Sequence, residues 1–127
     1  MDIGVFIFDT DYSINISELA RELEERGYES LFVPEHTHIP TSRRSPFPGG
    51  GELPKQYSHT LDPFVSLGFA AASTKNLKIG TGICLLPQRD PIVTAKSIAS
   101  LDLMSKGRFV LGLGGGWNVD ELSLIHI

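Results

Sequence analysis

The sequence predicts an α/β fold in which four short parallel strands alternate with three crossover helices. Short apolar runs recur along the 127 residues, stretches with helical spacing separate them, and helix-start and helix-stop residues mark the boundaries. The runs are apolar throughout, as expected for strands covered by helices on one side. The other side would face a barrel interior or a second helix layer.

The first strand is predicted at 3–8 and the second at 30–33, where Pro34 ends it. Between them, apolar residues at the spacing i, i+3, i+4, i+7 start at Ile16 and indicate an amphipathic helix. Asn15 is the expected N-cap and Gly27 the expected stop. The first βα unit is therefore complete.

Two Asp-Pro pairs, at 62–63 and 90–91, predict the starts of the second and third helices. Strands are expected at 78–85 and 108–113, and Gly107 ends the third helix, which covers 92–105. The long segment 34–61 has no period and is rich in Pro, Gly and Ser. We expect a lid or binding loop there, with a disordered surface insertion as the alternative.

Composition argues against several classes of function. The net charge of -4 provides no positive field for a nucleic-acid backbone. A single cysteine, Cys84, cannot form an intramolecular disulfide, and the chain has neither a secretory leader pattern nor an apolar run of membrane-spanning length. We expect a cytoplasmic protein that binds neither nucleic acid nor membrane.

Chain length bears on the fold, because a closed eight-stranded α/β barrel needs roughly 200 residues or more. This chain supplies half of the strands, so we expect a fragment, with one partial barrel domain at 1–121. The tail at 122–127 reads Leu-Ser-Leu-Ile-His-Ile, the translation of a transposase-end adapter used in sequencing libraries. We expect this tail to be non-native; a genuine short amphipathic tail is the alternative.

Sites in parallel α/β folds lie at the carboxyl ends of strands, which directs attention to His36. An imidazole can donate or accept a proton near neutral pH, and Glu35 beside it could adjust that tendency. The alternative is a histidine that only stabilises a loop. His36 and His38, with His59 or Asp9, have a spacing open to a metal, but no metal motif accompanies them and we expect no metal site.

The glycines at 112 and 114–116 do not complete a dinucleotide fingerprint, because Trp117 stands where the last glycine is needed. They allow either the close approach of a ligand or backbone, or a tight turn. Trp117 could stack on a flat ring or simply pack. Arg89 could hold a carboxylate, although a surface ion pair with Asp90 or a nearby acid is the favoured interpretation.

Three segments carry a resemblance to a known family: 31–36 (LFVPEH), 79–87 (IGTGICLLP) and 107–118 (GRFVLGLGGGWN), together with Arg-Asp-Pro at 89–91 and Ala-Lys at 95–96. As a set they resemble the luciferase-like monooxygenase superfamily, and more narrowly its coenzyme F420-dependent oxidoreductase branch. The resemblance runs from the first strand to about Glu121. It implies that the chain is the N-terminal half of a (β/α)8 TIM barrel, with a deazaflavin or flavin over the carboxyl ends of the strands.

The resemblance also implies roles for particular residues. His36 would be catalytic, close to the reactive edge of the ring, while Glu35, Gly82 and Ile83 would bind the cofactor, with a cis peptide at the Gly82-Ile83 bulge. Trp117 occupies the position of a proton-donating glutamate in some relatives, so we expect it to line the substrate pocket instead. The phosphate-bearing tail of the cofactor would be bound by the second half of the barrel.

The favoured function is hydride transfer between F420 and an unknown small organic substrate, in a full-length protein that we expect to be a homo-oligomer. FMN-dependent monooxygenation within the same fold is the nearest alternative. A non-catalytic half-barrel that associates with another chain is a second class. A metal-dependent hydrolase using His36 and His38 is remote.

Overall fold

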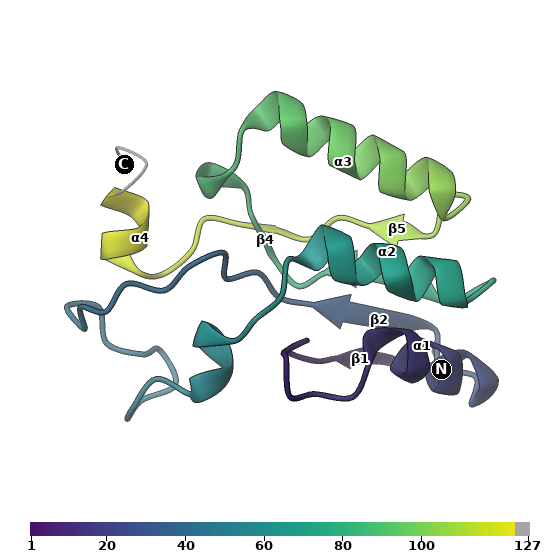
Figure 1. The fold of residues 1–127 in the computed structure, drawn as a ribbon, viewed down its shortest axis with the longest axis horizontal. Coiled ribbons are helices and arrows are strands. Elements are labelled where there is room, and N and C mark those ends of the chain that lie inside the picture. The colour runs from purple at the N-terminus through teal and green to yellow at the C-terminus, as the bar shows by residue number, and fades with distance from the viewer. Residues whose placement is uncertain (124–127) are drawn as a thin grey trace.

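The computed structural model describes residues 1–123 and confirms an α/β fold built on a parallel sheet (Figure 1). The sheet contains β1 (Gly4–Phe6), β2 (Ser30–Val33), β3 (Lys78–Thr81) and β5 (Phe109–Val110), in the order β1-β2-β3-β5. Every pairing is parallel, with Leu31 opposite Ile79 and Ile79 opposite Phe109. The predicted count of four parallel strands is therefore correct.

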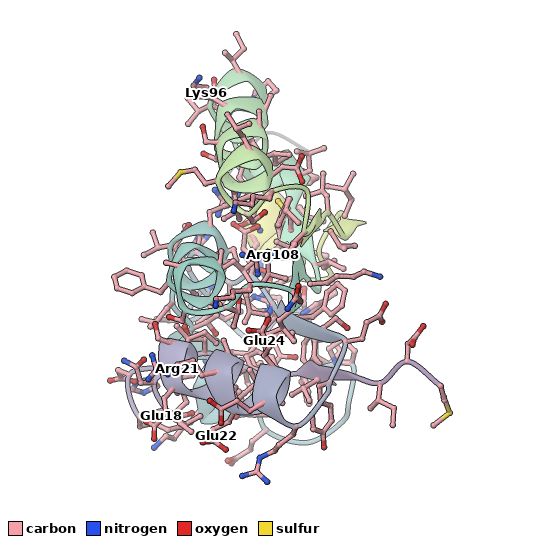
Figure 2. All side chains as sticks on the ribbon, turned by 90° about the vertical axis from the view of Figure 1, so that its right-hand side faces the viewer. Glu18, Arg21, Glu22, Glu24, Lys96 and Arg108 are labelled. Atoms are coloured by element: carbon pink, nitrogen blue, oxygen red, sulfur yellow. The ribbon has the colours of Figure 1, made fainter. Side chains whose placement is uncertain are left out.

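Three helices, α1 (Ile16–Glu25), α2 (Pro63–Ser73) and α3 (Pro91–Met104), cover one face of this sheet (Figures 1 and 2). Their starts are those the sequence predicts. The side chains of Asn15, Asp62 and Asp90 each accept a hydrogen bond from a backbone N–H of the first turn, at 2.8–3.1 Å. Gly27 and Gly107, which follow α1 and α3, have φ of 78° and 79°, which glycine adopts without strain.

The hydrophobic core lies between the sheet and the helices. Strand residues that point toward the helices are almost fully buried. The opposite face of the sheet is open, since Phe6 of β1 and Val110 of β5 are 54% and 40% exposed. The buried core consists of Ile16, Ala20, Leu23, Leu31, Val33, Leu67, Ala70, Ala71, Leu77, Ile79 and Leu101.

The third and fourth strands are shorter than predicted, which corrects the ranges 78–85 and 108–113. Each breaks in the middle, and the outer pieces, β4 (Cys84–Leu85) and β6 (Leu113–Gly114), pair with one another in a separate parallel ladder. At the break the Thr81 hydroxyl accepts from the Gly112 N–H at 3.0 Å and donates to the Gly112 carbonyl at 2.9 Å. A side chain therefore replaces the backbone ladder at this point, and the strands bend.

Glu24 and Arg108 form hydrogen bonds at the amino ends of the strands. This end of the sheet faces the viewer in Figure 2. The Glu24 carboxylate accepts the backbone N–H groups of residues 75–77, which form the turn into β3. These bonds outweigh the effect of burial and hold the pKa of Glu24 below its ordinary value. Arg108 donates to the carbonyls of Ala71 and Leu77. The end opposite the candidate site is thus held by polar contacts.

The long segment 34–61 and the short helix α4 (Val119–Ser123) lie together at the carboxyl ends of the strands (Figure 1). The segment contains a 3-10 turn, η1 (Lys55–Ser58), and a second such turn, η2 (Leu86–Gln88), follows β4. Asp120 of α4 accepts from Ser42 and Arg44, and the Ser45 hydroxyl accepts the Val119 N–H at 2.8 Å. These contacts place the loop against α4, and its role as a binding loop stays a prediction.

Leu122 and Ser123 belong to α4, whereas the rest of the predicted non-native tail, residues 124–127, lies outside the described residues. Within the described part of the chain, no helix combines the length and the apolar character needed to cross a membrane.

Candidate functional site

A cavity of about 470 Å³ opens at the carboxyl ends of the strands, which is the size of an ordinary small-molecule pocket. It brings together all five residues predicted to form the site, namely His36, Glu35, Gly82, Ile83 and Trp117. Its other lining residues are mainly apolar or aromatic: Phe6, Phe8, Pro34, Tyr57, Leu85, Gly115 and Gly116.

His36 follows β2 and packs against Tyr57, with ring centroids 4.5 Å apart. Its Nδ1 lies 3.7 Å from Oε1 of Glu121 in α4. The two side chains are 8% and 1% exposed. Neither the Nδ1 atom nor the two carboxylate oxygens of Glu121 have a hydrogen-bond partner among the described residues. The imidazole thus sits between the cavity and a buried carboxylate.

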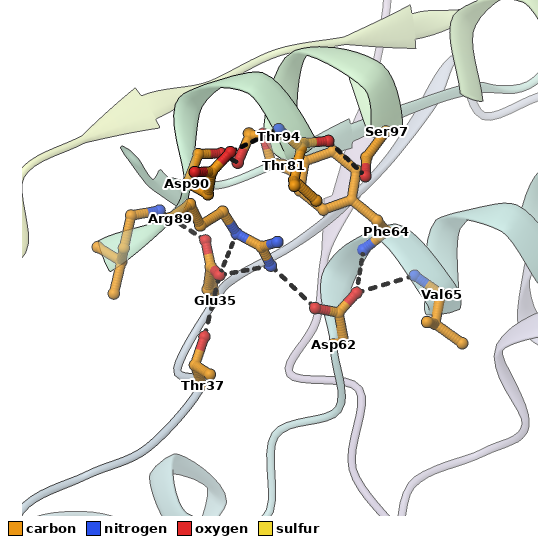
Figure 3. Close-up of polar contacts among 12 residues, drawn as sticks. Glu35, Thr37, Asp62, Phe64, Val65, Thr81, Arg89, Asp90, Thr94 and Ser97 are labelled. Carbon is orange, nitrogen blue, oxygen red and sulfur yellow. Dashed lines mark hydrogen bonds and ion pairs between the residues drawn. The ribbon is translucent and has the colours of Figure 1, made fainter. Parts of the chain in front are cut away.

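Glu35 points the other way, into a buried polar network (Figure 3). One carboxylate oxygen accepts the Leu85 N–H at 2.6 Å, and the other accepts Nε of Arg89 at 2.6 Å and the Thr37 hydroxyl at 3.1 Å. Arg89 also donates to Asp62 at 2.8 Å. The carboxylate therefore connects the end of β2 to the β4 backbone beside the cavity.

Arg89 forms an ion pair with acids, as predicted, but the pair is not on the surface and does not include Asp90. The Arg89 side chain is only 18% exposed and its partners are Glu35 and Asp62, whereas Asp90 caps α3. Its guanidinium also lies 4.6 Å from the centre of the Phe64 ring. Next to this network, burial and then the negative charge of Glu35 raise the pKa of Cys84 to about 12, so the thiol stays protonated.

The floor of the cavity is built from residues with little or no side chain. The peptide bond Gly82-Ile83 is cis, as the family resemblance predicts. A Cβ on Gly112 would lie 2.2 Å from the backbone carbonyl oxygen of Thr81, so glycine is needed for this close approach of the two strands. Gly115 and Gly116 line the cavity, and Gly116 has a φ of 86°. The glycine run serves both a close approach and a turn.

Aromatic rings from separate parts of the chain form one wall. Tyr57 is the centre of this group, with ring centroids 5.1 Å from Phe8, 5.5 Å from Phe47 and 6.3 Å from Trp117. Burial raises the pKa of Tyr57 above its ordinary value, so its hydroxyl is neutral. Aromatic rings offer flat apolar faces, and Tyr and Trp also carry a polar group at the edge. Such a wall suits a flat ring system.

The histidines do not converge on a metal site. His59 pairs with Asp11 at 2.8 Å and packs against Tyr12, while His36 packs against Tyr57. Within residues 1–123 there is no cluster of three or more His, Cys, Asp or Glu side chains arranged to hold a metal ion.

The sequence missed two residues of the site. Glu121 is one of several residues after the fourth strand, and no local signal distinguishes it. Its contact with His36 joins positions that are far apart in the sequence. Tyr57 lies in the aperiodic loop, where no period marks it. The sole signal for Tyr57 was its place in a segment already expected to form a binding loop.

The cavity residues fit the ring of a flavin or deazaflavin better than its tail. The glycine floor and aromatic wall offer flat surfaces, while His36 offers a polar edge. None of the described residues that line the cavity is a lysine or arginine, the usual partners of phosphate groups.

Sequence comparison gives a consistent family. The model of the family described as luciferase-like monooxygenase matches residues 1–124. An uncharacterized protein of Mycobacterium tuberculosis is 46% identical over 96% of this chain and 44% of its own length. The 4-hydroxyprotoasukamycin monooxygenase of Streptomyces nodosus is 33% identical over 87% of this chain and 25% of its own. The 5,10-methylenetetrahydromethanopterin reductase of Methanolobus tindarius is 28% identical over 91% of this chain and 29% of its own length.

Solved structures share the fold. The oxygenating constituent of 3,6-diketocamphane monooxygenase from Pseudomonas putida, in complex with FMN, has a TM-score of 0.75 at 21% identity, over 100% of this chain and 33% of that one. The coenzyme F420-dependent tetrahydromethanopterin reductase from Methanopyrus kandleri has a TM-score of 0.70 at 24% identity, over 99% and 30%. The chain thus spans less than half the length of each of these proteins and forms part of a TIM barrel.

Proposed function

Since this chain belongs to the luciferase-like monooxygenase family, we propose that its cavity binds the ring of coenzyme F420 for hydride exchange with a small organic substrate. The observation that carries the proposal is the cavity itself, where His36, Gly82, Ile83 and Trp117 meet over a glycine floor. The relative named as a methylenetetrahydromethanopterin reductase supports a reductase activity. The whole barrel would be needed for turnover.

The bound deazaflavin would supply or accept the hydride, and the residues of this chain would position it and the substrate. Gly82, Gly115 and Gly116 present a surface without side chains, which would let a ring approach the backbone, and Ile83 beside them adds an apolar contact. Trp117 and Tyr57 form the adjoining wall and would cover part of a bound ring. His36 supplies the polar group at this site, where it would donate a proton or stabilise negative charge.

Glu35 contributes through the backbone rather than through contact with the ring. Its carboxylate is saturated by the Leu85 N–H, Thr37 and Arg89. It would therefore bind the cofactor indirectly, by holding β4 and the Gly82-Ile83 bulge where the ring would lie.

FMN-dependent monooxygenation is the second candidate. It is favoured by the 33% identical relative named as a monooxygenase. Both candidates use the same cavity and differ in the ring that it holds.

The test is absorbance spectroscopy of the protein with oxidised F420 and, separately, with FMN. We expect a shift of the F420 band with the unaltered protein, and a weaker shift with Trp117→Ala. Arg21→Ala, an exposed change on α1, serves as the control. A shift with FMN alone would favour the monooxygenase, and no shift with either would overturn both assignments.

A further inference from the structure

Glu121 is a buried carboxylate without a conventional partner. Its side chain is 1% exposed, and neither oxygen accepts a hydrogen bond from any described residue. Burying an ionised carboxylate without compensation is costly, so buried acids are normally paired or hydrogen-bonded. Among residues 1–123, the one ionisable group of opposite sign within ion-pair distance of it is His36.

Two arginines at this end of the molecule form ion pairs with acids other than Glu121. Arg44 pairs with Asp120, the neighbour of Glu121 in α4. Arg89 pairs with Glu35 and Asp62. Of the basic side chains at this end, the imidazole of His36 is therefore the one that faces the Glu121 carboxylate.

The geometry specifies which nitrogen is involved. Nδ1 is buried without a partner and lies 3.7 Å from Oε1 of Glu121, slightly beyond hydrogen-bond distance. Contacts of this kind are often long in unliganded sites and shorten when a ligand binds. The tautomer of a neutral histidine is set by the hydrogen bond that one of its nitrogens makes.

We propose that Glu121 is the positioning residue of His36: its carboxylate accepts the Nδ1 proton and leaves Nε2 as the nitrogen that serves the cavity. Tyr57 packs against the same imidazole with the two ring planes at 56°. The role of Nε2 toward a ligand rests on the proposed function. The tautomer of His36 does not, because it is a property of the protein without cofactor.

The test is ¹⁵N NMR of the histidine rings in the unaltered chain, at a pH where imidazoles are neutral. Long-range proton–nitrogen correlations distinguish the two tautomers directly. We expect His36 to carry its proton on Nδ1. In Glu121→Leu, which removes the acceptor, we expect this signal to be lost and His36 to carry its proton on Nε2.

His59 provides a control, because its Nδ1 lies 2.8 Å from Asp11 in an exposed pair, away from the buried pair of His36 and Glu121. Asp11→Leu should change the His59 signals and leave His36 unaltered. An Nε2–H tautomer of His36 in the unaltered chain would overturn the proposal, and this result needs no variant to fold. Retention of the Nδ1–H tautomer in a folded Glu121→Leu variant would overturn it as well. Adding F420 to the same samples reports separately on the proposed function.

Discussion

Glu35 and His36 are neighbours in sequence but belong to different parts of the site. Successive side chains of an extended segment point to opposite sides, so one enters the polar network of Arg89 while the other faces Glu121 and Tyr57. A pair that reads as one motif in the sequence therefore serves two purposes. The histidine lines the cavity, and the glutamate holds the backbone beside it.

The buried pair of Glu35 and Arg89 yields a stability prediction. Arg89→Met leaves the Glu35 carboxylate buried with no cation, so we expect the free energy of unfolding to fall by roughly 3 kcal/mol. Urea unfolding followed by circular dichroism measures this change. The exposed Arg21→Met on α1 is the control and should stay within about 0.5 kcal/mol of the unaltered chain. Equal effects of the two substitutions would show that the pair contributes little.

At the scale of elements, Asp62 links helix capping to the site. Its carboxylate accepts the first N–H groups of α2 and also binds Arg89, whereas Asp90 only caps α3. We expect Asp90→Ala to cost about 1 kcal/mol, the usual value of a cap. Asp62→Ala should cost more, because it also removes the ion pair. Thermal unfolding of both variants checks the order, and a smaller loss for Asp62→Ala would contradict this account.

Contacts between the 34–61 loop and α4 predict a response to acid. Hydrogen bonds from Arg44 and Ser42 hold the pKa of Asp120 below its ordinary value of about 3.9. The contact of Asp120 with the loop is therefore fully formed at a pH above the ordinary pKa of an aspartate. It is lost as the pH falls through the lowered pKa of Asp120 in the folded chain. Trp117 should report this, since its ring lies 6.2 Å from Phe47 of the loop.

We expect tryptophan fluorescence to be constant down to about pH 4 and to change below it. In Asp120→Asn, the emission should already be altered at neutral pH, with no acid transition. Far-UV circular dichroism identifies any global acid unfolding. A variant with the same fluorescence profile as the unaltered chain would show that the Asp120 contact does not hold the loop.

The whole molecule exposes apolar surfaces that a complete barrel would cover. Phe6 and Val110 are exposed on the open side of the sheet, Ile83 and Leu113 are exposed beyond its strands, and Leu103 and Met104 of α3 are each 80% exposed. Exposed apolar patches of this extent favour association. We expect the 13.9 kDa chain to elute from a size-exclusion column as an assembly rather than as a monomer. A stable monomer on light scattering would contradict this expectation.

The sequence predicts the order of elements well because local signals define them. Asn15, Asp62 and Asp90 cap the helices, and the apolar runs become parallel strands. The breaks in the last two strands were missed because they depend on a cross-strand contact between Thr81 and Gly112.

In the candidate site, too, the sequence identifies some residues and misses contacts between distant positions. The ends of predicted strands point to His36 and Trp117, whereas Gly82 and Ile83 are implied by the family resemblance alone, and the structure brings all four to one cavity. The contact of Glu121 with His36 and the link of Arg89 to Glu35 were missed. Both join residues more than 50 positions apart, and no local pattern reports such distances.

The central claim is that a flat cofactor ring binds at the carboxyl ends of the strands, and NMR mapping tests it most directly. In a titration of the ¹⁵N-labelled chain with F420, we predict shifts of the Trp117 indole and of the Gly115 and Gly116 amides. The amides of residues 75–77, at the opposite end of the strands, should not move. Shifts confined to that end, or to the groove between α2 and α3, would contradict the claim.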